Sequence, residues 1–177
     1  DGEPDRIFMA VDPAFGGGDF VAAPVCFQYG TDIYVHEVVY DDGDKRVTQP
    51  LLANAIVKNN VQAAQFEATK ATMAYKEGVE ELLKAKGYHM NITTKAAPTD
   101  KAKFQRIFDK APEIRENMIF RESGKRDKAY SLFMQNVFSY TMFKKNAHDD
   151  AADSLTMAMN MVRTMNGSVV EVFHRPF

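Results

Sequence analysis

Three apolar runs near the start of the chain are joined by very short connections, and this feature constrains the fold more than any other. The runs span residues 6–14, 20–28 and 33–40. The turns between them read Gly16-Gly17-Gly18-Asp19 and Tyr29-Gly30-Thr31-Asp32, which is typical turn chemistry. Parallel neighbours need a crossover of a dozen or more residues, so turns this short join antiparallel strands. The sequence therefore predicts an antiparallel meander of three strands.

Helices and strands alternate after the meander. Apolar residues at helical spacing predict helices, and short apolar runs predict strands. We expect helices at 48–59, 73–85, 101–109 (capped by Asp100 or Thr99), 129–140 and 149–165. We expect strands at 61–68 and 89–96, a short edge strand at 119–121, a polar loop at 122–128, and a strand or tail at 169–173. This order predicts a single α/β domain over residues 1–177, with a central mixed β-sheet flanked by helices.

Composition narrows the class of protein. A chain of 177 residues with 45% hydrophobic and 26% charged residues suits one soluble globular domain. A net charge of −2 argues against a strongly basic coat protein, but a local basic patch is compatible with a nuclease. The single cysteine, Cys26, predicts no disulfide framework or zinc cluster and fits a reducing compartment. We find no apolar run long enough for a membrane span and no signal peptide. Because the chain begins at Asp1, we expect a domain excised from a longer protein.

Acidic residues stand at three conspicuous places. Asp12 and Glu67 end apolar strands, and Asp149, Asp150 and Asp153 open the last helix. A carboxylate at the end of a buried strand is costly unless its charge is compensated. Carboxylates brought together raise each other's pKa values unless a hard divalent cation lies between them. A site built only of carboxylates indicates Mg²⁺ or Mn²⁺ and phosphodiester chemistry.

Helical geometry ranks the three aspartates of the last helix. At 100° per residue, Asp149 falls opposite the apolar face, Asp150 near its border and Asp153 between them. Asp150 is therefore the preferred catalytic ligand beside Asp12 and Glu67, and Asp153 is a further metal ligand. The alternative, in which these residues only cap turns and helix ends, accounts less well for all three places together. Asp149, like Asp19 and His148 elsewhere in the chain, is a candidate for a supporting position beside the metal.

Basic residues supply candidate DNA contacts. They gather at Lys101, Lys103 and Arg106, at Arg121, Lys125, Arg126 and Lys128, and at Lys144 and Lys145. Such groups are often solvated faces, but beside an acidic metal site they become natural phosphate contacts. The chain has no phosphate-binding P-loop motif, no dinucleotide fingerprint and no convincing nucleophile motif of a serine or cysteine hydrolase.

Taken in order, these motifs resemble the C-terminal nuclease domain of tailed-phage large terminase subunits, over nearly the whole chain. They are Val11-Asp12-Pro13-Ala14 followed by the triple glycine and Asp19, the strand with Glu67, Lys103-Phe104-Gln105-Arg106-Ile107, and His148-Asp149-Asp150-Ala151-Ala152-Asp153-Ser154-Leu155. The last motif is the strongest. The signature is also similar to that of RuvC-type Holliday-junction resolvases.

The resemblance implies a ribonuclease H-like fold and an endonuclease that cuts concatemeric viral DNA during packaging. It implies that Asp12, Glu67 and Asp150 hold two Mg²⁺ or Mn²⁺ ions, with Asp153 or Asp149 as an additional partner. The implied partners are double-stranded DNA, an ATPase motor in the same polypeptide, the small terminase subunit and the portal protein, in the cytoplasm of a bacterial host. The alternatives are a RuvC-like junction-resolving nuclease and a non-catalytic DNA-binding module of the same fold.

Overall fold

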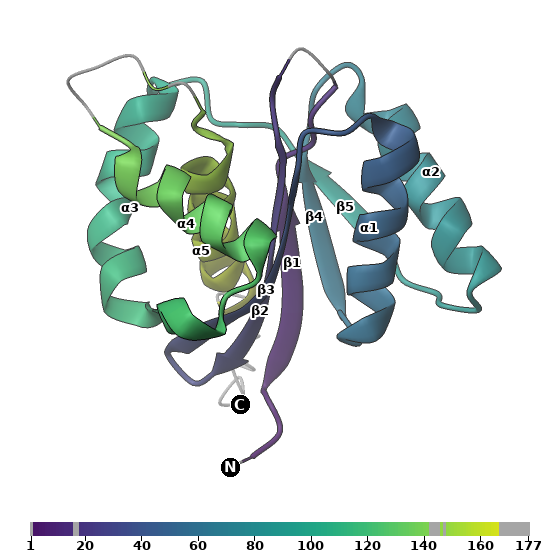
Figure 1. Cartoon of the computed structure of the whole chain (residues 1–177), viewed down its shortest axis with the longest axis horizontal. Helices are drawn as coiled ribbons and strands as arrows, with labels where there is room; N and C mark the ends of the chain where they lie inside the picture. The colour runs from purple at the N-terminus through teal and green to yellow at the C-terminus, as the bar shows by residue number, and fades with distance from the viewer. Residues whose placement is uncertain (1, 16–17, 142–145, 147, 167–177) are drawn as a thin grey trace, which may run out of the picture.

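Helices cover both faces of a six-stranded sheet in the computed structural model, which describes residues 2–15, 18–141, 146 and 148–166 (Figure 1). The strands are β1 (Arg6–Val11), β2 (Val21–Tyr29), β3 (Asp32–Asp41), β4 (Ala63–Glu67), β5 (Ile92–Lys95) and β6 (Met118–Phe120). The helices are α1 (Lys45–Lys58), α2 (Thr72–Ala85), α3 (Lys103–Asn117), α4 (Lys128–Ser139) and α5 (Asp150–Asn166), with a short 3₁₀ turn η1 (Ser123–Lys125).

The predicted antiparallel meander is confirmed. β1 pairs antiparallel with β2, and β2 pairs antiparallel with β3. On one side β4 and then β5 add in parallel to β1, and on the other side β6 adds in parallel to β3, giving the order β5-β4-β1-β2-β3-β6. The sheet is therefore mixed, as the turn lengths and the later helix–strand alternation predicted.

Strand alternation divides the core between the two faces of the sheet. Along β1, Met9 and Val11 belong to the core shared with α1 and α2, whereas Phe8 and Ala10 belong to the core shared with α4 and α5. This follows from the two-residue period of a strand, which sends successive side chains to opposite faces. Figure 1 shows α1 and α2 on one face and α3, α4 and α5 on the other.

Two helices differ from the predicted ranges by more than one residue at an end. α1 begins at Lys45 rather than residue 48, because the Asp44 side chain accepts a hydrogen bond from the Arg46 backbone N–H and caps the helix. The N-cap of α3 is Ala102, so neither Asp100 nor Thr99 caps it as predicted. α3 also continues past residue 109 to Asn117, with Pro112 inside it. Proline removes one helical hydrogen bond, but the apolar side chains on either side of it still pack toward the sheet.

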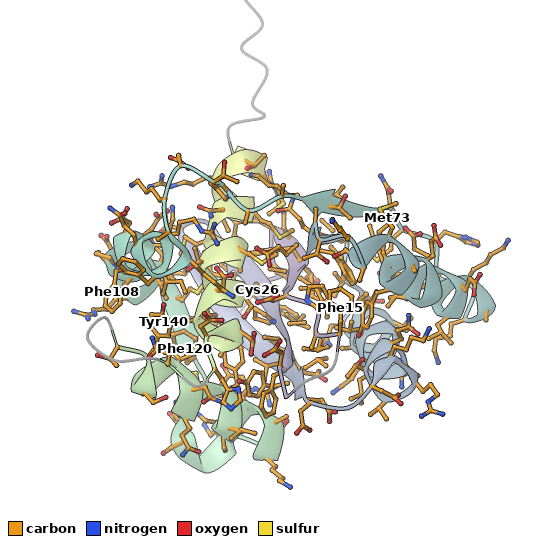
Figure 2. All side chains as sticks on the ribbon, turned by 90° about the horizontal axis from the view of Figure 1, so that it is seen from above. Phe15, Cys26, Met73, Phe108, Phe120 and Tyr140 are labelled. Atoms are coloured by element: carbon orange, nitrogen blue, oxygen red, sulfur yellow. The ribbon has the colours of Figure 1, made fainter. Side chains whose placement is uncertain are left out.

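Three smaller predictions have mixed outcomes. The predicted strand or tail at 169–173 lies outside the described residues. Within the described part of the chain, no helix has both the length and the apolar character needed to cross a membrane. Cys26 is fully buried in the sheet, and burial raises the pKa of its thiol. This is the behaviour of a small core residue, as Figure 2 shows from above.

Candidate metal centre

Two neighbouring parallel strands end side by side and place the first two carboxylates. Val11 of β1 pairs with Phe66 of β4, so the next residues, Asp12 and Glu67, lie together at the carboxyl edge of the sheet. The backbone N–H and C=O of Asp12 both bond to Ala22, at 3.0 Å each. The carbonyl of Glu67 accepts a 2.7 Å hydrogen bond from the Thr72 hydroxyl at the start of α2. Both backbones are therefore fixed before any ligand binds.

The first turn of α5 supplies the third carboxylate. Asp12, Glu67 and Asp153 each offer an oxygen, and these atoms all lie within 4.8 Å of one another. Asp12 is 7% exposed and Asp153 is 2% exposed, while Glu67 is half-buried. We call this group the acidic triad. Among the described residues it is the one compact cluster with metal-ligand chemistry.

Asp150 lies one turn before Asp153 and outside the triad. It is buried, and its Oδ2 accepts a hydrogen bond of 3.3 Å from the Phe20 backbone N–H. Burial raises the pKa of Asp150, with smaller contributions from Asp149 and the exposed Asp19, while the Phe20 hydrogen bond and Lys103 lower it. The geometry thus favours Asp153 as third member of the group. Metal ligation by Asp150 stays a prediction.

A lysine lies among the carboxylates. Lys103 Nζ is 2.8 Å from Asp149 Oδ1, 3.1 Å from Asp153 Oδ2 and 3.7 Å from Asp12 Oδ2. Burial lowers the pKa of Lys103, but the carboxylates of Asp153 and Asp12 outweigh it, so the net shift is upward. Arg106 Nη2 approaches Asp153 Oδ2 at 3.9 Å. Both residues were predicted as phosphate contacts, and in this structure they act first as counter-charges to the acidic residues.

The acidic triad nevertheless keeps unsatisfied acceptors. Asp12 Oδ2 and Asp153 Oδ2 are buried and accept no hydrogen bond among the described residues. The ion pairs with Lys103 and Arg106 described above are their charge partners. Burial raises the pKa of Asp12 to about 8; Lys103 opposes the shift, and Glu67, Asp153 and Asp150 add to it. Burial and Asp153 likewise raise the pKa of Glu67. Carboxylate oxygens that accept no hydrogen bond, in a rigid and buried group, fit a hard divalent cation.

The remaining predicted residues are dispersed. His148 packs edge-on against Phe20, with ring centroids 5.1 Å apart, and its buried Nδ1 has no hydrogen-bond partner among the described residues. Lys101 pairs with Asp109 at 2.6 Å, both half exposed. Lys144 and Lys145 lie outside the described residues.

The second basic group lies away from the acidic triad. Its members Arg121, Lys125, Arg126 and Lys128 follow β6, which pairs with the start of β3. Asp12, by contrast, bridges to Ala22, which pairs with the end of β3. Arg126 donates to the Arg121 carbonyl, and Lys125 pairs with Glu122. Contact of this group with DNA stays a prediction.

The sequence analysis missed a cavity that adjoins the acidic triad. It has a volume of about 320 Å³ and is lined by Glu67 and Asp153 together with Lys95, Asn160 and Arg163, among others. The signal was present on α5, because residues 153, 156, 160 and 163 recur at helical spacing and form a polar stripe on a largely apolar helix. Lys95 stands opposite Glu67 in the pairing of β5 with β4.

No protein-family model and no curated protein sequence matches the chain. Solved structures do resemble it. The nuclease domain of the large terminase subunit gp2 of bacterial virus Sf6 is 11% identical, with a TM-score of 0.60 over 89% of each chain. The manganese-soaked, inhibitor-bound terminase nuclease domain of human cytomegalovirus is 7% identical, with a TM-score of 0.62 over 89% of this chain and 83% of that one.

A resolvase is also similar. Fowlpox virus resolvase, in complex with its substrate Holliday junction DNA, is 15% identical, with a TM-score of 0.53 over 90% of this chain and 99% of that one. At these identities the likeness concerns the fold. The chain has the ribonuclease H-like fold that the resemblance implied, with the predicted mixed sheet.

Proposed function

We propose that this chain is a divalent-metal-dependent endonuclease that hydrolyses phosphodiester bonds in DNA, of the kind found in terminase large subunits. One observation carries the proposal. Three carboxylates, two of them almost fully buried, converge within 4.8 Å, and Asp12 Oδ2 and Asp153 Oδ2 accept no hydrogen bond among the described residues. Such a group is costly as a purely structural feature, and the neighbours from Sf6 and cytomegalovirus are nuclease domains by name.

The residues fit Mg²⁺ or Mn²⁺. Oxygen-only ligation suits these hard ions, and Asp12, Glu67 and Asp153 would hold them, with Asp150 as a further candidate. When bound, a pair of such ions supplies activation of a water and stabilisation of the leaving oxygen. The cytomegalovirus neighbour was studied with manganese, which supports the same ion type here.

The chain's own residues prepare the site. The bridge to Ala22 fixes Asp12 at the end of β1, and the hydroxyl of Thr72 fixes the backbone of Glu67, so the ligand geometry is set in advance. Lys103 neutralises part of the carboxylate charge in the metal-free protein. Once cations take over that task, its ammonium group is free to turn about a flexible stem toward the scissile phosphate. That movement would give Lys103 the DNA contact that the sequence predicted.

The wider biological setting follows from the resemblance. We propose that the substrate is concatemeric viral DNA and that an ATPase motor in the same polypeptide, a small terminase subunit and a portal protein are the partners. The setting would be the cytoplasm of a bacterial host. The Sf6 and cytomegalovirus likenesses support this reading, since both are terminase nuclease domains.

A junction-resolving nuclease is the second candidate, and the fowlpox resolvase likeness favours it. Strong preference for four-way junctions over linear duplex, together with a stable dimer in solution, would identify it. A non-catalytic DNA-binding module of the same fold would bind DNA without binding Mn²⁺.

Cleavage of supercoiled plasmid tests the proposal. The protein is incubated with Mn²⁺ or Mg²⁺, with EDTA as the metal-free reaction. We expect metal-dependent nicking that is lost in Asp12→Asn and kept in Asp32→Asn, a matched change at the exposed first residue of β3. Equal nicking by Asp12→Asn and the wild type would refute the assignment of the site. Absence of nicking, with Mn²⁺ binding also absent in calorimetry, would favour the binding module.

A further inference from the structure

The cavity beside the acidic triad is lined by side chains of both charges. The carboxylates of Glu67 and Asp153 line it, with Lys95 opposite Glu67 and with Arg106 Nη2 3.9 Å from Asp153 Oδ2. A third cationic side chain of the lining, Arg163, lies farther along α5. Arg163 follows Asp153 by ten positions on α5, which is about 15 Å along a helix. The cavity therefore extends well past the space that one phosphate at the metal site would occupy.

The fold builds this cavity between the sheet edge and α5. Residues 65 and 67 of β4 point to the face that α5 covers, because their neighbours Ala64 and Phe66 pack in the opposite core. Lys95 pairs with Glu67 across β4 and β5 and lines the same cavity. The segment after β5 closes one side, and Arg106 holds it there by donating a 2.7 Å hydrogen bond to the carbonyl of Pro98.

Two of the cationic side chains in the lining, Lys95 and Arg163, are only partly neutralised. Arg163 Nε donates to Glu113 Oε1 at 2.9 Å, and its side chain is 68% exposed. Within the described part of the chain, its other guanidinium donors have no hydrogen-bond partner, and Lys95 forms no ion pair. Glu113 is shared with Lys110, at 3.0 Å. The cavity thus offers two side chains with donors to spare, and anions are the ligands that such a pair attracts.

The volume of the cavity and its partly apolar wall limit which ligands it can hold. A volume of about 320 Å³ lies at the lower end of small-molecule pockets, roughly 300–1,000 Å³. Part of the wall is apolar, from Ala96, Ala97, Pro98 and Met157. A double helix is far too wide for this space, whereas a single nucleotide, with one charged phosphate and one flat apolar face, matches both the size and the lining.

We propose that this cavity binds one unpaired nucleotide of the strand being cut, next to the scissile phosphate. Lys95 and Arg163 hold the phosphate of that nucleotide, and the apolar wall receives its base or sugar. The domain therefore prefers DNA that is locally single-stranded at the cut. This inference rests on the proposed nuclease function and adds its substrate class and two substrate-positioning residues.

A charge-matched pair of double variants tests the cavity. Lys95→Gln with Arg163→Gln removes two positive charges at the cavity. Lys84→Gln with Lys86→Gln removes two from exposed positions at the end of α2, on the other face of the sheet. Thermal melting of all proteins in EDTA checks that each is folded. Calorimetric titration with Mn²⁺ is expected to give the same affinity for both double variants.

The first readout is binding, which needs no cleavage. Fluorescence anisotropy in EDTA measures the affinity for a labelled single-stranded oligonucleotide at several salt concentrations. Each phosphate contact to a single strand adds about 0.7 to the slope of log affinity against log salt. Because Lys95 and Arg163 are proposed to hold a single phosphate, its loss should make the slope shallower by about 0.7 in the cavity variant. An equal slope in both double variants would overturn the proposal.

The second readout is cleavage in Mn²⁺ of two labelled duplexes of one sequence, fully paired or with a short mismatched bubble. We expect the wild type and the α2 variant to favour the bubble through a lower KM. The cavity variant should lose that preference while its kcat stays similar. Metal-dependent cleavage by the wild type with no bubble preference would refute the cavity assignment alone. Absence of cleavage on every substrate would refute the nuclease function. The salt dependence of oligonucleotide binding would still test whether the cavity binds a nucleotide.

Discussion

The buried carboxyl of Asp12 destabilises the metal-free fold, although the proposed metal site requires it. Asp12→Asn separates these two effects. In the metal-free protein its carboxyl is 7% exposed, and burial raises its pKa from 3.8 to about 8. The unfolded chain releases this proton near its ordinary pKa, while the folded protein keeps it until about pH 8. The contribution of Asp12 to the free energy of unfolding is therefore most favourable below pH 3.8, falls as pH rises, and becomes constant above pH 8.

The magnitude follows from the pKa shift. One unit corresponds to about 1.4 kcal/mol, and about three units separate pH 3.8 from pH 7, so the carboxyl costs the fold roughly 4 kcal/mol at neutral pH. Asparagine has nearly the same shape and no charge. As Asp12 begins to ionise near pH 8, asparagine also deprives Lys103 of a carboxylate neighbour at 3.7 Å, which offsets part of the gain. We expect a net stabilisation of about 1–3 kcal/mol, or several degrees in Tm for a domain of this size.

The assay is thermal melting in EDTA from pH 5 to pH 9, with Asp32→Asn as the exposed control. The gap in Tm between Asp12→Asn and the wild type should widen as pH rises toward 8. In saturating Mn²⁺ the order should reverse, because an ion at 100 times its Kd stabilises the folded wild type by about 2.7 kcal/mol. A gap that is independent of pH, or a variant less stable than the wild type in EDTA at pH 8, would refute the reasoning.

Three further predictions concern single side chains. Removing the ammonium in Lys103→Gln should lower Tm in EDTA and enlarge the stabilisation by Mn²⁺, since both cations serve the same carboxylates; melting with and without metal checks it. Asp153→Asn should weaken Mn²⁺ binding in calorimetry more than Asp150→Asn, and the reverse order would restore Asp150 as third ligand. Tyr130→Phe removes the 2.7 Å hydrogen bond to the Val35 carbonyl and should cost about 1–2 kcal/mol in urea unfolding.

The sheet was predictable because its governing signals are local. Turn lengths between the first three strands leave antiparallel pairing as the one option, and the alternation of later helices and strands requires parallel additions. The placement of Asp12 and Glu67 follows from the same signals, since both residues end strands that the sequence delimits. Once the two strands are neighbours in parallel, their next residues must meet at one edge.

Local sequence signals could not identify the third carboxylate of the acidic triad. The choice between Asp150 and Asp153 depends on how α5 is rotated against its surroundings. A helical wheel gives that rotation only when one face meets solvent. α5 is packed against β1 and β2 and also against α3 and α4, as the view from above shows, so most of its circumference is buried (Figure 2). Tertiary packing, and not the apolar pattern, sets which aspartate faces the strand ends.

The position of the Lys103 side chain is a second feature that could not be predicted from the sequence. Lys103 donates a hydrogen bond to Asp149, which lies 46 positions away in the sequence. No local sequence pattern predicts such a contact. A lysine near an acidic nuclease site reads naturally as a phosphate contact. In the metal-free fold the nearest anions are the chain's own carboxylates, and their attraction decides where the side chain lies.

The balance of charges around the site predicts how many metal ions it binds. Five carboxyl groups (Asp12, Glu67, Asp149, Asp150 and Asp153) face two cations, Lys103 and Arg106, which leaves a deficit of three charges when all are ionised. One divalent ion leaves the site at minus one, which repels a phosphodiester. Two ions bring it to plus one, which a phosphodiester neutralises. We therefore expect one Mn²⁺ per chain without DNA and two with an uncleavable phosphorothioate oligonucleotide, counted by electron paramagnetic resonance. A count that DNA leaves unchanged would contradict this charge argument.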